Sequence, residues 1–135
     1  MIAWNALVEH IKMKYPVTDE TAEMISIITA VADDRRQSVY IRKLSTDGAD
    51  WLEISTPVCV ESDLDPRDAL ERNAAFVTGS LALLRSGTVV YRHSLPLQTT
   101  AESDAEGLAM VDALVQSTAQ TGDELELELT GADNF

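Results

Sequence analysis

Residues 70–97 read LERNAAFVTGSLALLRSGTVVYRHSLPL, and this stretch decides the fold more than any other part of the chain. Gly79 is expected to release the end of a helix into the next strand. Two apolar strands, 81–84 and 89–95, then pair across Ser86-Gly87, a dipeptide typical of tight hairpins. The stretch contains no obvious catalyst, so it predicts a scaffold and not an active site.

The composition indicates one domain, 1–135, that is strongly acidic. The 135 residues carry a net charge of −13, and 45% of them are hydrophobic, which suffices for one core. Arg92 is the last basic residue; nine acids follow it, whereas fourteen acids and ten basic residues precede them. A field of this sign repels nucleic acid and anionic membrane, so neither is expected as a partner. A protein or peptide, preferably basic, is expected instead.

The remaining composition favours a cytoplasmic protein. Cys59 is the only cysteine, which excludes an intramolecular disulfide. The first residues lack the basic and apolar pattern of a secretion signal, and no apolar run reaches the ~18 residues of a membrane span.

The elements before residue 70 are predicted from apolar spacing and turn residues. A short amphipathic helix ends at Pro16, and Asp65-Pro66 caps a second helix whose buried stripe is Leu70, Ala74 and Val77. Between these helices lie three strands, predicted over 24–31, 39–44 and 52–58. In the third strand the even-numbered residues should face the core, and Glu53 and Ser55 should face water.

The last segment has two interpretations. Charge and leucine alternate from Glu124 to Leu129, which alone would indicate a strand. A helical seam spaced by three and four residues nevertheless runs from Leu108 to Leu129, and Gly131 provides a stop after Thr130. We therefore expect one helix from about 101 to 130, with Gly122 marking a bend or a close contact.

This order, α-β-β-β-α-β-β-α, predicts an α+β fold with a five-stranded antiparallel sheet flanked by three helices. The order and its motifs resemble the type III secretion chaperone-like fold, and within it the YbjN-like family of bacterial regulators. The motifs are Leu70 and Asn73, Gly79, Gly87, Tyr91-Arg92 and Leu95-Pro96-Leu97. The resemblance implies a scaffold without enzymatic activity that often dimerises and binds protein segments.

The hairpin strands are apolar on both sides, which indicates an interface. We expect Leu81, Leu83, Val90 and Arg92 to lie on one face as a candidate protein interface. Internal cover of this face by the last helix is an equally good interpretation. A homodimer through the hairpin is the favoured assembly.

Catalysis has weak support in the sequence. A small hydrolase using His93 is an alternative, but no serine lies in a G-x-S-x-G elbow. Two distant histidines and one cysteine lack the spacing of metal ligands, and the glycines form no nucleotide-binding motif, so no metal or cofactor is expected.

The favoured function is therefore a non-enzymatic protein-binding module, a YbjN-like regulator or a chaperone-like adaptor. It would capture a protein segment on its sheet, while Glu124, Glu126 and Glu128 form an acidic face that steers basic partners. A dedicated secretion chaperone is an alternative. A third hypothesis, suggested by charge alone, is an acidic decoy for a nucleic-acid-binding protein.

Overall fold

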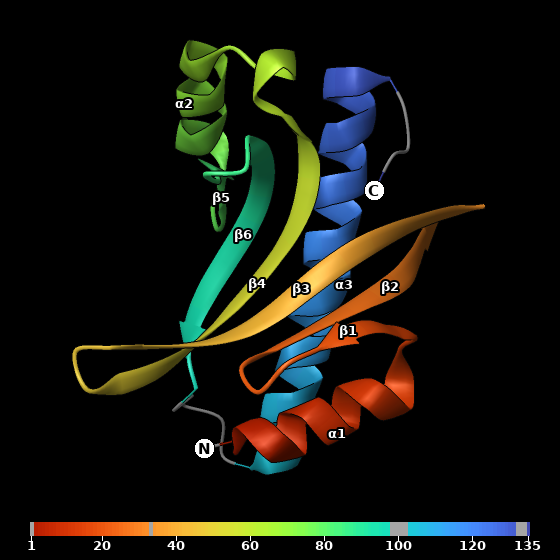
Figure 1. Ribbon diagram of the computed structural model, residues 1–135, viewed down its shortest axis with the longest axis vertical. Helices are drawn as coiled ribbons and strands as arrows, with labels where there is room; N and C mark the ends of the chain where they lie inside the picture. The colour runs from red at the N-terminus through yellow and green to blue at the C-terminus, as the bar shows by residue number, and fades with distance from the viewer. Residues whose placement is uncertain (1, 33, 98–102, 132–134) are drawn as a thin grey trace.

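The computed structural model describes residues 2–32, 34–97, 103–131 and 135 of the chain (Figure 1). The described elements are α1 (Trp4–Lys14), β1 (Val17–Glu20), β2 (Met24–Ala32), β3 (Arg35–Thr46), β4 (Ala49–Val60), a 3-10 turn (Glu61–Asp63), α2 (Pro66–Ala75), β5 (Ser80–Leu83), β6 (Thr88–Pro96) and α3 (Asp104–Thr130).

The strands form one antiparallel sheet in the order β1-β2-β3-β4-β6-β5. This confirms the α+β class and the antiparallel sheet, but the prediction of five strands is wrong because the described residues form six. The missed strand is β1, whose four residues, Val17-Thr18-Asp19-Glu20, are all exposed. A polar edge strand has no apolar face to bury, so periodicity gives no signal for it.

The turn residues behave as their chemistry predicts. Asp47 and Gly48 both have positive φ, 52° and 76°, and join β3 to β4. Asp65 caps α2 by accepting a hydrogen bond from the Arg67 N–H at 3.0 Å. Gly131 adopts φ 71° and ends α3.

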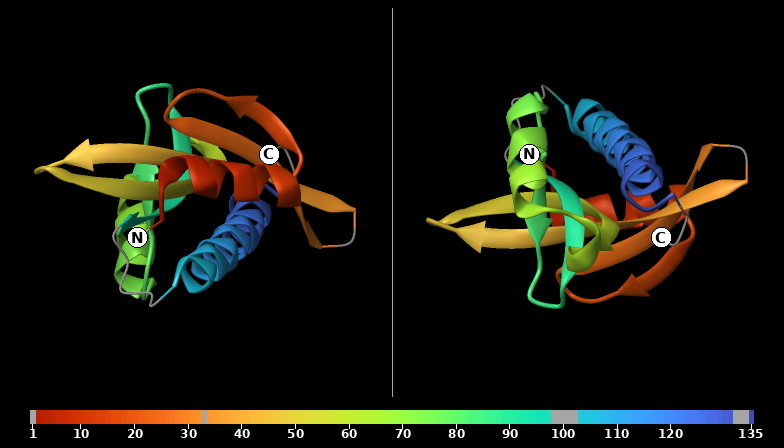
Figure 2. Two further views of the ribbon diagram at one scale, coloured as in Figure 1. Left: turned by 90° about the horizontal axis from the view of Figure 1, so that it is seen from below. Right: turned by 90° about the horizontal axis from the view of Figure 1, so that it is seen from above.

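The helices cover one face of the sheet and divide the core into two clusters. In the larger cluster, α1 and α3 pack on β2, β3 and β4 through residues such as Leu7, Ile27, Ile54 and Val115. In the smaller cluster, the end of α3 packs on β4, β5 and β6, with partly buried residues of α2 against it. Figure 2 shows α2 and α3 on one side of the β3–β4 pair.

The last segment is one helix, as predicted. Its seam residues Val111, Val115, Thr118, Gly122 and Leu125 are buried. At about 1.5 Å per residue, the 27 residues of α3 span roughly 40 Å, enough to reach both clusters. Gly122 marks a close contact, because a Cβ at this position would overlap Thr56 Cγ2.

The predicted buried stripe of α2 is wrong. Leu70 is 70% exposed and Val77 is 99% exposed, and no residue within α2 is fully buried. The helix ends at Ala75, and only its edge residue Ala69, followed by Phe76, packs on the core. The apolar side of α2 instead borders an open groove.

No helix among the described residues is both long enough and apolar enough to cross a membrane.

Candidate protein-binding surfaces

The first surface is a groove of about 390 Å³ between α2 and the edge strand β5. Its lining is mostly apolar and includes Leu64, Ala69, Leu70, Leu81 and Leu83. Leu70 and Leu83 are 70% and 59% exposed. We call it the α2–β5 groove. Two large aliphatic side chains exposed on the two walls of one groove are typical of a contact site.

On the outer edge of β5, the outward backbone groups of one residue, Leu81, have hydrogen-bond partners. Asn73 of α2 accepts a hydrogen bond from the Leu81 N–H at 2.7 Å and donates one to the Leu81 carbonyl at 3.3 Å. Leu84 instead bonds inward, its N–H donating to the Thr88 carbonyl at 2.9 Å. By strand alternation the N–H and C=O groups of Leu83 point outward like those of Leu81. Asn73 therefore binds the outward N–H and C=O groups of Leu81, whereas those of Leu83 face the groove.

The four residues predicted as one interface lie on two faces, so their grouping was wrong. Leu81 pairs with Tyr91 and Leu83 with Val89, which places both leucines on the helix-covered side. Val90 and Arg92 project from the opposite side. The sequence suggested a two-residue turn, whereas this register leaves Arg85-Ser86-Gly87 as a three-residue loop. Because side chains alternate along a strand, one extra loop residue moves every side chain of one strand to the other side of the sheet relative to its partner strand.

The second surface is the helix-free face of the sheet, which forms a trough of about 570 Å³. Figure 2 shows β1–β2 and the β5–β6 loop projecting to this side of the β3–β4 pair. Glu53 and Ser55, which were predicted to face water, lie in the trough and are buried, at 6% and 8% exposure. The prediction failed because strand alternation shows which residues lie on the face away from the core. It does not show that the sheet curves around these residues and buries them. We call this surface the open-face trough.

The predicted acidic face of α3 is divided in a similar way. Glu124 and Glu128 are exposed, whereas Glu126 is fully buried. Residues two apart on a helix point in nearly opposite directions, so these three could not share one face. Glu128 also forms an ion pair with Arg72 of α2, at 2.9 Å. Steering by the two exposed glutamates stays a prediction.

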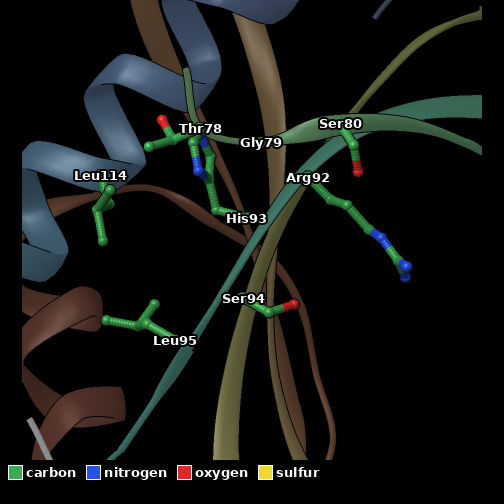
Figure 3. A pocket seen from close by; sticks show the side chains of 8 residues that line it. All are labelled: Thr78, Gly79, Ser80, Arg92, His93, Ser94, Leu95 and Leu114. Atoms are coloured by element: carbon green, nitrogen blue, oxygen red, sulfur yellow. The ribbon is translucent and has the colours of Figure 1, made fainter. Parts of the chain in front are cut away.

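His93 lies beside a pocket of about 460 Å³ near the start of β5 (Figure 3). Its ring packs edge-on against Tyr91, with the ring centroids 5.2 Å apart. Burial lowers the pKa of His93. In Figure 3, His93 points to one side of β6, while Ser80 and Ser94 point to the other. Neither serine is placed as a nucleophile that His93 could activate.

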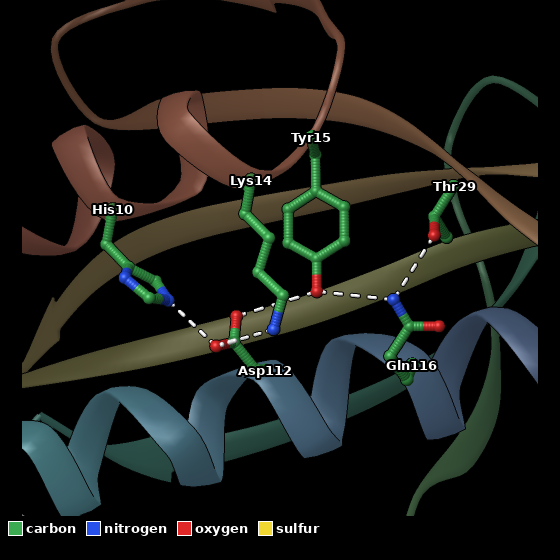
Figure 4. Close-up of polar contacts among 6 residues, drawn as sticks. All are labelled: His10, Lys14, Tyr15, Thr29, Asp112 and Gln116. Carbon is green, nitrogen blue, oxygen red and sulfur yellow. Dashed lines mark hydrogen bonds and ion pairs between the residues drawn. The ribbon is translucent and has the colours of Figure 1, made fainter.

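A polar cluster connects α1 to α3 (Figure 4). Asp112 Oδ2 lies 2.8 Å from His10 Nε2 and 3.0 Å from Lys14 Nζ. Gln116 donates hydrogen bonds to the Tyr15 hydroxyl at 3.3 Å and to Thr29 Oγ1 at 3.2 Å. These side chains bind one another across the helix interface. We assign the cluster to the packing of α1 on α3.

The described residues contain no group of three or more His, Cys, Asp or Glu side chains arranged to hold a metal ion. Cys59 is 1% exposed and belongs to the smaller core cluster. Burial raises its pKa to about 11, so the thiol stays protonated at neutral pH.

No family model and no curated protein matches the chain. Among solved structures, a chain of the HopA1-SchA chaperone-effector complex is similar in fold, with a TM-score of 0.47 and 11% sequence identity. The alignment covers 82% of this chain and 90% of that chain. The α+β fold assigned here is based on the strand order and helix packing described above.

Proposed function

We propose that the chain is a non-enzymatic protein-binding module that works as a homodimer, either as a YbjN-like regulator or as a chaperone-like adaptor. The α2–β5 groove is the observation that carries this proposal. A dedicated secretion chaperone would use the same surface, and the identity of its cargo would distinguish it from a regulator.

The groove is suited to a protein rather than to a small molecule. It lies along the free edge of the sheet, and the exposed Leu70 and Leu83 form its two walls. A strand placed against β5 would meet the outward backbone groups of Leu83 and cover both leucines. Strand addition of this kind combines main-chain hydrogen bonds with apolar contacts.

A second copy of the chain is the occupant that the charge distribution favours. The α2 side chains Arg67, Asp68, Glu71 and Arg72 sum to zero and form two ion pairs within the helix, at 3.1 and 2.9 Å. The lining of the groove itself carries one charged residue, Glu61, so this surface is far less acidic than a molecule of net charge −13 as a whole. Two copies related by a twofold axis at β5 would bury the same leucines on each side, with little charge repulsion between them.

Light scattering across a concentration series tests this assembly. The wild-type protein should give twice the 14.7 kDa chain mass. Leu83→Glu should give a monomer with an unchanged circular dichroism spectrum, because it places a charge in the contact.

The matched control is Met13→Glu, which changes an 89% exposed methionine on α1, outside the groove. This variant should remain dimeric. A monomeric wild-type protein, or a dimer insensitive to Leu83→Glu, would overturn the proposed assembly.

A further inference from the structure

Two arginines flank one buried glutamate in the open-face trough. Arg42 of β3 lies 3.0 Å from Glu53 Oε1, and Arg92 of β6 lies 3.2 Å from Glu53 Oε2. The three residues come from adjacent strands, with Arg42 directly opposite Glu53 in the register. Both carboxylate oxygens of Glu53 are thus engaged, one by each guanidinium.

Glu53 fixes the two guanidinium groups without using all of their donors. Its side chain is only 8% exposed, whereas those of Arg42 and Arg92 are 48% and 42% exposed. A guanidinium has five N–H donors in a planar fork. Arg42 uses only Nη2 and Arg92 only Nη1 to contact Glu53. The remaining N–H donors of the two half-exposed arginines are available to the carboxylate of a ligand, and the contact with Glu53 already fixes their orientation.

The surroundings of the arginine pair are largely apolar and carry little net charge. Val90, at 5% exposure, Pro57 and Tyr40 line the same trough. The charged side chains of the lining are Arg42, Arg92 and Glu53, which sum to +1, and Phe135 adds the carboxylate at the end of the given sequence. The whole chain has a net charge of −13, so the trough is far less acidic than the molecule around it.

We propose that the open-face trough binds an extended protein segment that carries a single carboxylate between apolar side chains. The carboxylate would contact Arg42 and Arg92, and its apolar neighbours would cover the exposed part of Tyr40. A second copy of the chain is disfavoured here, because a symmetric contact would oppose two positive centres. A segment that is otherwise neutral or basic would also be attracted by the net charge of the protein.

This inference rests on the proposed function in taking the ligand to be a protein segment, but it concerns the opposite face from the α2–β5 groove. The experiment is a display selection of randomised ten-residue peptides on the full chain. The enriched peptides should share one Asp or Glu flanked by apolar residues. Replacing that acid by its amide in an enriched peptide should weaken binding about tenfold, the effect of one charged hydrogen bond.

The protein variant removes the arginine pair without leaving an unpaired buried charge. Arg42→Gln alone would leave the buried Glu53 poorly compensated, so the variant combines Arg42→Gln, Glu53→Gln and Arg92→Gln. In this variant the acidic peptide and its amide counterpart should bind equally. If the variant does not fold, the comparison of the two peptides on wild-type protein still tests the proposal.

The groove variant Leu83→Glu is the matched control and should retain the preference for the acidic peptide. Selection of peptides without a common carboxylate, no enrichment, or peptide binding that Leu83→Glu abolishes would each overturn the inference. Dimerisation can fail while the preference for the acidic peptide holds, and the preference can fail while the protein still dimerises. The two proposals can therefore be tested separately.

Discussion

Gly122 of α3 lies so close to Thr56 of β4 that a side chain at position 122 has no room. The Thr56 hydroxyl is already occupied, donating to the Ser38 carbonyl at 2.6 Å and accepting from Gln37 Nε2 at 2.9 Å. Its methyl group is what a side chain at position 122 would meet. Helix propensity favours alanine over glycine by about 1 kcal/mol, so packing opposes propensity here.

Gly122→Ala should therefore destabilise the protein. Overpacking typically costs about 1–3 kcal/mol, which exceeds the gain in helix propensity. Urea unfolding should show a lower midpoint with an unchanged slope. Adding Thr56→Ser removes the methyl group but keeps the hydroxyl, and should restore most of the loss. A stabilising effect of Gly122→Ala alone would contradict the close contact.

His93 gives the fold a pH dependence of known sign. Burial lowers its pKa from the ordinary 6.5, so below that pH the unfolded chain binds more protons than the folded one. The free energy of unfolding should be unaffected by His93 above pH 6.5 and should fall as the pH drops through that value. His93→Phe should remove this part of the pH profile in urea titrations. An unchanged profile would show that His93 is not responsible.

At the scale of elements, α1 is held to α3 by an apolar contact and by the polar cluster around Asp112. Leu7 and Ile11 are fully buried in the apolar contact. At its edge, Asp112 pairs with Lys14 and His10. The Asp112 hydrogen bond is the largest factor that raises the pKa of Lys14. The polar cluster thus fixes the orientation of a helix that the apolar residues hold in place.

Asp112→Asn should loosen α1 without unfolding the sheet. Amide hydrogen exchange should become faster in residues 4–14, and the pKa of Lys14 should move back toward 10.5. Glu9→Gln is the control, because Glu9 is 72% exposed and pairs only loosely with Lys12, at 3.8 Å. Unchanged exchange in Asp112→Asn would mean that the apolar contact alone determines the orientation of α1.

The elements that the sequence predicted well are those with a long period or a strict turn chemistry. The seam of α3 repeats over more than twenty residues, and Asp65-Pro66 marks the start of α2 by hydrogen-bond and ring geometry. The elements it missed depend on tertiary placement. β1 has no apolar face, and Leu70 of α2 follows a helical apolar pattern but faces a groove.

The candidate sites were harder to predict than the elements. The arginine pair comes from β3 and β6, which are 50 residues apart in the chain at Arg42 and Arg92 and are joined through Glu53 of the strand between them. Only the strand order brings these residues together. The interface prediction named Arg92 and Leu83 but placed them on one face, because the sequence did not reveal that the hairpin loop is one residue longer.

At the scale of the whole molecule, the two candidate surfaces lie on different sides of one sheet. The α2–β5 groove is at the free edge on the side of the helices, and the open-face trough is on the side without helices. A dimer formed through the groove would therefore leave both troughs accessible. Such a dimer could hold two sites of one partner and gain affinity from their linkage.

The position of α3 in the chain also has a consequence for synthesis. Because α3 follows the six described strands, a ribosome makes the whole sheet and α1 before the helix that completes the cover of Ile27, Ile41 and Ile54. At 5–20 residues per second, translating the 27 residues of α3 takes roughly 1–5 s, during which that apolar face has only the cover that α1 supplies. A nascent chain halted before Asp104 should therefore bind cellular chaperones or aggregate, even though every strand is already present.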